Sequence, residues 1–489
     1  MNTVSPGRSA AMAARLVLNP GLDAGFLKSW APQARALLGS LLCFLPAMAL
    51  ALQPIEHARL DERLEVYWVL DHALPMVDIQ IDFDAGSRFD PPGRSGLSGA
   101  TAQMLSKGVL GEGGKSLAHA KDDSKAARLP PLDENAVGQA WADLGAIFAA
   151  SSSDDRLSVY LRSLVKRDIL DKAVELGSRQ IGAPAFDATI WRRERAMSVS
   201  SIEESLTQPA AVASKLFREN VFGAHPYGQS VTVASVKAIE PQDLKRFHQQ
   251  FFTPCRARVS MVGDLQRADV ERIARALLSR LPKPQSCAAL APTPAMPAVK
   301  PLAASKIVAL PFAATQAHVL MGQPGIARDD KRYFPLTVGN YILGGGGFVS
   351  RLTDQVREKR GLSYSVYSYF YPELQTGPFT IGLQTRKDQA HQALAVVGEV
   401  LSDFVKQGPT PAELQAAKDN LMGGFALRID NNKKLLDNIA NIAWFGLPLD
   451  YLQTWTQAVQ AVTVESVHEA FKSVLDPERM VTVIVGDPS

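Results

Sequence analysis

The sequence predicts an α+β protein built from two homologous halves, each a mixed β-sheet covered by helices. Three observations predict this class. Residues 236–264 match residues 459–487 at a constant offset of 223, and both copies end in Val-Gly-Asp. Each copy reads as a helical pattern, a proline and then a β-branched strand, so both units contain strands and helices. Between the copies, residues 281–302 contain six prolines, which favour an extended spacer.

Three patterns define the start of the first half. Residues 77–83 alternate apolar and polar side chains, the period-two pattern of a half-buried strand. The small and apolar residues of 96–108 predict a buried helix. Residues 146–161 predict two strands joined around a polar turn at 151–155. This order of strands and helices is what an α+β unit requires.

The rest of the first half is expected to be largely helical. Residues 165–180 and 187–205 have helical patterns. Residues 110–135 are rich in Gly, Lys, Asp and Pro, so we interpret them as a loop that is free to move. Together with the Pro-rich linker, these patterns set the two halves at 53–280 and 303–489.

The first 51 residues have the pattern of a secretory leader. Basic residues lead up to Arg35, an apolar run covers 36–45, and small residues follow through Ala51. Cleavage is expected after Ala49 or Ala51, which places the mature chain in a periplasm. The alternative is a membrane anchor, but the apolar run is short for a bilayer span.

Charge and cysteine content narrow the function further. The chain has 489 residues and a net charge of +3, all of which comes from the leader, so the remaining residues balance to zero. That balance argues against nucleic acid as a partner, because phosphate binding needs a basic excess. Outside the leader only Cys255 and Cys287 remain. In an oxidising compartment they form either a disulfide or two unpaired thiols.

One pair of residues in the second half could take part in binding or catalysis. Residues 348–360 predict a helix that ends at Gly361, followed by a strand over 362–370. Arg357 therefore lies on the last helical turn and Tyr364 near the start of the strand. A guanidinium can bind a carbonyl or carboxylate, and a phenol can donate to an oxyanion. The alternative is an exposed Arg and a packed Tyr, and spacing alone favours that alternative.

The chain resembles the pitrilysin/insulinase-type zinc peptidases. The stretch LGGGGFVSRLTDQVREKRGLSYSVYS is similar to their second-half signature, and FGAHPYGQSV and DLKRFHQQFFTPCRARVSMVGD are similar to first-half segments. The resemblance covers nearly all of residues 60–487. It implies a clamshell of two repeated units, the fold of LuxS-like and processing-peptidase-like metalloenzymes. It also implies that Arg357 and Tyr364 bind substrate and assist a tetrahedral intermediate, and that Gly345, Gly346 and Gly347 contact substrate.

The zinc motif of this family is degenerate here. Its HxxEH segment corresponds to Gly99-Ala-Thr-Ala102-Gln103, so two histidine ligands become Gly99 and Gln103 and the catalytic glutamate becomes Ala102. The distal glutamate ligand corresponds to Ser201. Without ligands, no metal can lower the pKa of a bound water. We therefore expect no metal in this chain.

The resemblance suggests three functional hypotheses. In the first, this chain is the non-metal subunit of an exported heterodimeric zinc endopeptidase, similar to mitochondrial processing peptidase. An HxxEH-containing partner would hold the zinc, and unfolded or short peptides would bind extended along a sheet edge. In the second, the chain is a catalytically inactive structural or binding homologue. In the third, it uses other zinc ligands, which the spacing of its eight histidines does not support.

Overall fold

The computed structural model describes residues 53–486, except for 61–63, 115–128, 283–285 and 291–292. The leader and most of the expected 110–135 loop therefore lie outside the described residues. Within the described part of the chain, no helix is both long and apolar enough to cross a membrane.

The first half contains a six-stranded mixed sheet. Its spatial order is β1-β2-β6-β3-β5-β4, with β2 and β6 parallel and every other neighbouring pair antiparallel. The strands are β1 Glu56–Arg59, β2 Glu65–Leu70, β3 Met76–Phe83, β4 Ile147–Ser152, β5 Leu157–Leu164 and β6 Ala257–Gly263. The expected strand over 77–83 is β3, and the expected strand pair is β4 and β5.

The second half repeats this topology with five strands. The order is β7-β11-β8-β10-β9, and again only β7 and β11 are parallel. The strands are β7 Lys306–Leu310, β8 Gln316–Pro324, β9 Ser365–Phe370, β10 Pro378–Arg386 and β11 Val481–Val485. β6 and β11 occupy equivalent places, as the repeated Val-Gly-Asp predicts. The fold is α+β with two homologous halves, as expected.

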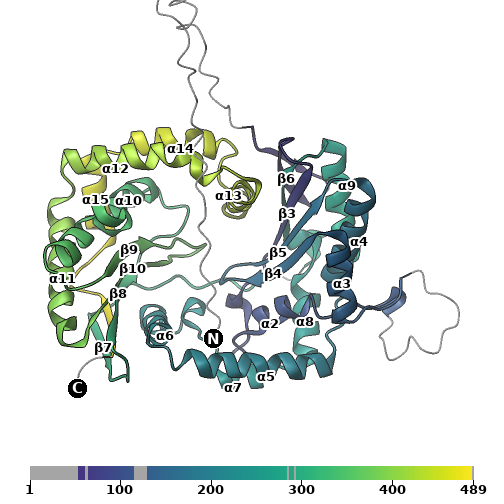
Figure 1. Cartoon of the computed structure of the whole chain (residues 1–489), viewed down its shortest axis with the longest axis horizontal. Helices are drawn as coiled ribbons and strands as arrows, with labels where there is room; N and C mark the ends of the chain where they lie inside the picture. Colours follow the sequence, from purple (N-terminus) through teal and green to yellow (C-terminus); the bar gives the residue numbers. More distant parts are fainter. Residues whose placement is uncertain (1–52, 61–63, 115–128, 283–285, 291–292, 487–489) are drawn as a thin grey trace, which may run out of the picture. The chain divides into compact units, whose positions relative to one another are not determined.

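Helices cover the outer face of each sheet (Figure 1). The helices of the first half are α2 Leu97–Met104, α3 Glu134–Leu144, α4 Arg167–Gly182, α5 Ala188–Ser205, α6 Pro209–Phe222, α7 Val233–Lys237, α8 Pro241–Phe251 and α9 Arg267–Leu277. The helices of the second half are α10 Tyr333–Asn340, α11 Ala390–Gln407, α12 Pro411–Gly423, α13 Asn432–Phe445, α14 Tyr451–Gln460 and α15 Val464–Val474.

The repeat preserves the signal that starts a helix. At the start of α8, the backbone N–H of Glu240 donates to Asp243 at 3.0 Å. At the equivalent start of α15, the N–H of Thr463 donates to Ser466 at 2.9 Å. Each residue three positions into the helix thus satisfies a backbone donor that the helix itself leaves unpaired.

Two helices pack across the boundary between the halves. α6, from the first half, packs on β8 and β11, and α13, from the second half, packs on β6 and β3 (Figure 1). The sequence does not predict this exchange, because periodicity shows that a helix has an apolar face but not which sheet that face packs on.

The second-half helix that carries Arg357 differs from expectation. A single helix was expected over 348–360, but a short 3₁₀ turn covers Gly347–Val349 and the π-helical segment η9 covers Thr353–Glu358. The N–H of Lys359 donates to the carbonyl of Asp354 at 2.9 Å, a bond five residues back along the chain. Leu352 and Val356 are buried on one stripe and Gly361 has φ +60°, as the pattern predicts. π-Helical turns are rare in proteins, and those that do occur are often found at functional sites.

Cys255 and Cys287 form a disulfide with 5.5 Å between their Cα atoms. Of the two possibilities that the sequence left open, a disulfide or two unpaired thiols, the structure has the disulfide. The bond ties the segment before β6 to the Pro-rich linker, across 32 residues of sequence.

Candidate functional site

Helix α2 places three of the four degenerate zinc positions, 99, 102 and 103, beside the edge strand β4, and the fourth, Ser201, lies on α5. Gly99 and Ser201 are exposed, Ala102 is buried and Gln103 is half-buried. A Cβ atom added to Gly99 would meet nothing within 4 Å, so the space for a larger side chain is still present there. The helix keeps its place in the fold while its side chains have changed.

Gln103 is engaged with a carboxylate. Its amide Nε2 donates to Glu194 Oε2 at 2.7 Å. Lys107 lies 3.1 Å from the other Glu194 oxygen, and Arg193 donates to that oxygen at 2.6 Å. Arg193 also binds both oxygens of Glu134, at 2.5 and 2.6 Å. A closed network of ion pairs therefore lies next to the degenerate motif.

Electrostatics hold Glu194 in its charged form. Burial acts to raise its pKa, but hydrogen bonds from Arg193 and Lys107 outweigh burial, so its pKa lies below the ordinary value. A carboxylate bound in this way has its acceptor positions occupied. This network was not predicted from the sequence, although the basic Arg193 next to Glu194 was a signal for it.

The residues at the zinc positions do not fit the metal. Zinc takes imidazole nitrogen, thiolate sulfur or carboxylate oxygen as ligands, and Gly99, Ala102, Gln103 and Ser201 offer none of these. Among the described residues, no group of three or more His, Cys, Asp or Glu is arranged to hold a metal ion. No chemical step through zinc can be assigned to the side chains of this segment.

The structure brings Arg357 and Tyr364 together. The guanidinium carbon of Arg357 lies 4.8 Å from the centre of the Tyr364 ring and 4.6 Å from that of Phe348. Tyr364 is 81% exposed, so it is not the packed tyrosine of the alternative interpretation. Phe348 and Val349 beside it are also exposed. The Arg357 Nε lies 3.3 Å from Glu358 Oε1, and the terminal N–H groups of a cation that is held beside two rings can still donate to a ligand.

The glycine run near this pair is closely packed at one end and open at the other. A Cβ at Gly345 would lie 2.7 Å from the Asn340 amide, and one at Gly346 would lie 2.6 Å from the Tyr341 carbonyl. Gly347 has φ +60° and open space around it. Gly345 and Gly347 line the same cavity as Arg357 and Tyr364. Their contact with a substrate stays a prediction.

The two edge strands differ in accessibility. In β9, the Tyr371 N–H donates to the Pro378 carbonyl, so the even-numbered residues direct their backbone groups away from β10. The outward carbonyl of Ser368 accepts from Asn340 Nδ2 at 3.0 Å, and Ser368 Oγ donates to Asn340 Oδ1 at 2.8 Å. Asn340 therefore caps the middle of this edge. Asn340 was not predicted as a functional residue, because nothing in the sequence pairs it with Ser368.

The equivalent edge of β4 is open. The Ser153 N–H donates to the Arg156 carbonyl at 2.8 Å, so Phe148, Ala150 and Ser152 direct their backbone groups away from β5. No other described residue hydrogen-bonds to these groups on that side. An edge of this kind can receive an added strand.

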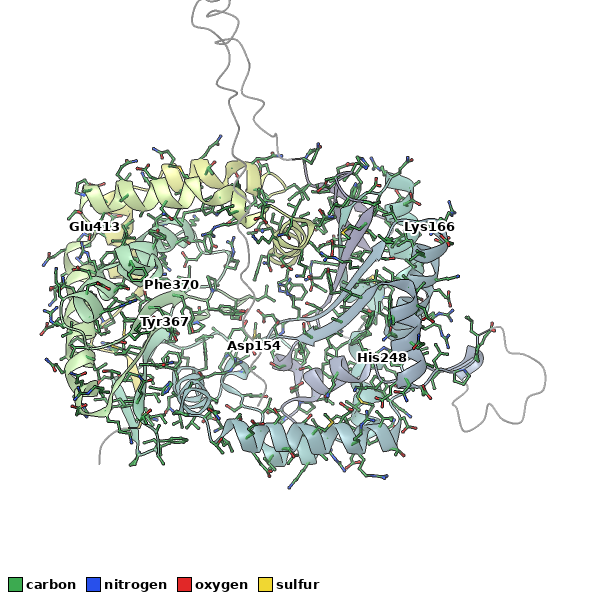
Figure 2. All side chains as sticks on the ribbon, in the orientation of Figure 1. Asp154, Lys166, His248, Tyr367, Phe370 and Glu413 are labelled. Carbon is green, nitrogen blue, oxygen red and sulfur yellow. A yellow bond between two sulfur atoms is a disulfide. The ribbon has the colours of Figure 1, made fainter. Side chains whose placement is uncertain are left out.

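The face of β9 adds an aromatic surface. Tyr367 and Tyr369 are each about 40% exposed and stack with their ring centres 5.9 Å apart. Phe370, which Figure 2 labels together with Tyr367, lies on the opposite face of the strand, and its ring centre is 4.7 Å from that of Phe379. One face of this strand is therefore part of the core and the other is available for contact.

Comparison with known proteins assigns the family. Residues 238–421 match the family model described as "Peptidase M16 inactive domain". The crystal structure of a peptidase M16 inactive domain from Pseudomonas fluorescens superposes with a TM-score of 0.80 at 32% identity, covering 89% of this chain and 98% of that one. This chain belongs to the peptidase M16 family. The resemblance to pitrilysin/insulinase-type peptidases is thereby confirmed.

Among other relatives, some are named as proteases and one is named as a non-peptidase. A "non-peptidase homolog" YmxG of Helicobacter pylori is 24% identical, over 91% of this chain and 95% of its own length. A match to an uncharacterized zinc protease of Streptomyces coelicolor is 32% identical, but it spans only 51% of this chain and 55% of that protein. A Helicobacter pylori protease structure has the same fold, with a TM-score of 0.76 at 18% identity.

Proposed function

We propose that this protein is a non-catalytic M16 homologue that binds extended peptides without hydrolysing them on its own. The observation that carries the proposal lies in the first half. The edge of β4 is open to an added strand, while helix α2 beside it offers no zinc ligand and Gln103 is bonded to Glu194. A peptide can therefore add to this edge, but no metal-activated water can attack it.

A labelled, unstructured peptide tests this function directly. We expect its fluorescence polarisation to rise with protein concentration, while a quenched version of the same peptide stays uncleaved. We also expect elemental analysis to find no stoichiometric zinc. Cleavage that a chelator abolishes would contradict the proposal, and so would the absence of peptide binding.

A second function is favoured by the exposure of Arg357 and Tyr364. We propose that these residues complete the active site of a separate subunit that carries HxxEH and zinc. The exposed Phe348, Val349 and Tyr364 support a contact with another protein, because neighbouring exposed apolar side chains often mark an interface. Tyr364 would donate to the oxyanion and Arg357 would bind a peptide carbonyl.

This second function is tested with the HxxEH-containing partner. Turnover of the mixture should fall in Arg357→Ala and Tyr364→Phe without dissociation of the complex. Arg360→Ala is the matched control, because Arg360 is exposed on the same segment and bonds only to Gln355 in the described structure. Unchanged turnover in both test variants would leave only the non-catalytic binding function.

We also propose that the protein is exported. The disulfide between Cys255 and Cys287 supports this location, because such bonds persist mainly in oxidising compartments. Cell fractionation with a compartment marker tests it. Recovery of the protein in the cytoplasmic fraction with reduced thiols would contradict export.

A further inference from the structure

A cavity of about 600 Å³ lies between the two sheets, and both halves line it. The edge strand β4 contributes residues 149–152 to its wall, and α13 and α14 contribute the facing wall. We call it the arginine cavity, after Arg328 and Arg428, which line it from the second half. A peptide that adds to β4 would run along this wall, so the side chains of the cavity would contact it.

Arg328 is held by aromatic rings and not by an acid. Its guanidinium carbon lies 3.7 Å from the centre of the Tyr333 ring and 5.2 Å from that of Tyr451. One N–H donates to the Tyr451 hydroxyl at 2.7 Å. No carboxylate of the described residues forms an ion pair with it. The rings fix the plane of the guanidinium but do not neutralise its charge.

Arg428 repeats the arrangement on the same wall. Its guanidinium carbon lies 5.4 Å from the centre of a Trp455 ring, and again no carboxylate of the described chain pairs with it. The other two basic residues of the cavity are neutralised. Lys433 pairs with Asp437, and Arg156 lies 3.3 Å from Asp82. Two cations therefore face the cavity with their charge unopposed.

The acidic residues of the cavity do not compensate for these cations. Asp155 already accepts from Tyr227 at 2.8 Å and from the Leu374 N–H at 2.9 Å, and it pairs with Arg88. Burial, together with the nearby Asp155, raises the pKa of Glu373 to about 9, so this side chain is neutral at pH 7. The cavity therefore carries an excess of positive charge where a peptide would pass.

We propose that the arginine cavity binds a carboxylate of the peptide, either its C-terminal carboxylate or an acidic side chain, through Arg328 and Arg428. A planar guanidinium matches a carboxylate with two parallel hydrogen bonds. The neighbouring aromatic rings hold each guanidinium in position for such a pair. This inference rests on the proposed peptide binding and specifies which peptides bind tightly.

The experiment compares short peptides of Gly, Ser and Leu that carry an uncharged fluorophore. One has a free C-terminal carboxylate, a second is the same peptide with an amidated C-terminus, and a third is amidated but contains internal Asp. We expect one or both of the acidic peptides to bind about tenfold more tightly than the neutral amide, which corresponds to about 1.4 kcal/mol. Whichever acidic peptide shows the gain identifies the source of the carboxylate.

Variants separate this proposal from the proposed function. Arg328→Gln and Arg428→Gln should each remove most of the tenfold preference and leave binding of the neutral amide unchanged. Arg386→Gln is the matched control, because Arg386 is exposed and pairs with Asp388 outside the cavity. Equal binding of all three peptides would overturn the carboxylate proposal while peptide binding stands. If no peptide binds, the proposed function fails as well.

Discussion

Each half of the chain packs one helix on the sheet of the other half, and the two contacts use different chemistry. α6 places Val212, Phe217 and Val221 against Val481 and other valines of β11. α13 meets polar groups, and Arg156 donates to Asn441 at 2.6 Å and lies 5.6 Å from the centre of a Trp444 ring. The apolar contact is a core, whereas the polar contact leaves the cavity described above.

The difference originates in the inner face of each sheet. In β3, Asp78, Gln80 and Asp82 are buried on the face toward α13 and alternate with the apolar residues that face the outer helices. In β11, valines occupy the corresponding face. The comparison teaches that a duplicated fold can keep its topology while one inner face becomes a core and the other a polar cavity.

The largest expected effect is the loss of the apolar contact. Phe217→Ala would leave a void beside β8 and β11 and should lower the free energy of unfolding by about 3–5 kcal/mol. Asn441→Ala in the polar contact removes one hydrogen bond and should cost about 1 kcal/mol. Denaturant unfolding measures both. Equal losses would show that the two contacts are energetically alike.

The second effect concerns the disulfide, which the second half lacks. Glu478 stands 223 residues beyond Cys255, so the second half has no cysteine at the equivalent position. Reduction, or the double change Cys255→Ser and Cys287→Ser, should lower the free energy of unfolding by about 2–4 kcal/mol. Hydrogen exchange should rise mainly around β6 and α9. A uniform rise in both halves would argue against a local role.

The third effect is a pH dependence of stability near two turns, the one between β4 and β5 and the one between β9 and β10. Glu373 lies beside Asp154, Asp155 and Arg218, and burial raises its pKa to about 9. The folded protein therefore holds a proton that the unfolded chain releases, so stability falls as pH rises. The fall is at most about 2.7 kcal/mol between about pH 6 and about pH 8.

Glu373→Gln tests this origin. The variant keeps a neutral side chain of the same shape, so its stability should depend less on pH across the same range. Urea unfolding at several pH values measures the slope. If the variant and the wild type have the same slope, another group carries the dependence.

The smallest effects compare one glycine from each half. A Cβ at Gly344 would lie 2.6 Å from the Ser368 N–H nitrogen, so Gly344→Ala should cost about 1–3 kcal/mol. Gly99 is helical and faces open space, so Gly99→Ala should stabilise the protein by about 0.5–1 kcal/mol. Thermal unfolding of the two variants checks both signs. Destabilisation by Gly99→Ala would mean that the space beside α2 is not free.

Much of the fold could be predicted from local patterns. The alternation in 77–83 predicts β3, and the constant offset of 223 residues predicts two units with equivalent β6 and β11. The π-helical turn around Arg357 could not be predicted, because periodicity does not distinguish a bond four residues back from one five residues back. The exchange of α6 and α13 was also not predictable, since it depends on which surfaces meet.

The candidate site also has features that the sequence predicts and features that it does not. The residues at 99, 102, 103 and 201 determine by their chemistry that this segment offers no zinc ligand, and a residue type can be read without coordinates. The pairing of Arg357 with Tyr364 was an expectation of the family resemblance, because spacing alone favoured an exposed Arg and a packed Tyr. The Gln103–Glu194 bond joins residues 91 positions apart, and nothing local signals it.

By itself the sequence determined the α+β class, the duplication and the degenerate zinc motif, because each depends on residue types and their spacing along the chain. Only the tertiary structure decided that Asn340 caps β9 while β4 stays open, and that Arg328 and Arg428 line one cavity. The physical reason is that hydrogen-bond partners and local charge depend on which distant segments pack together.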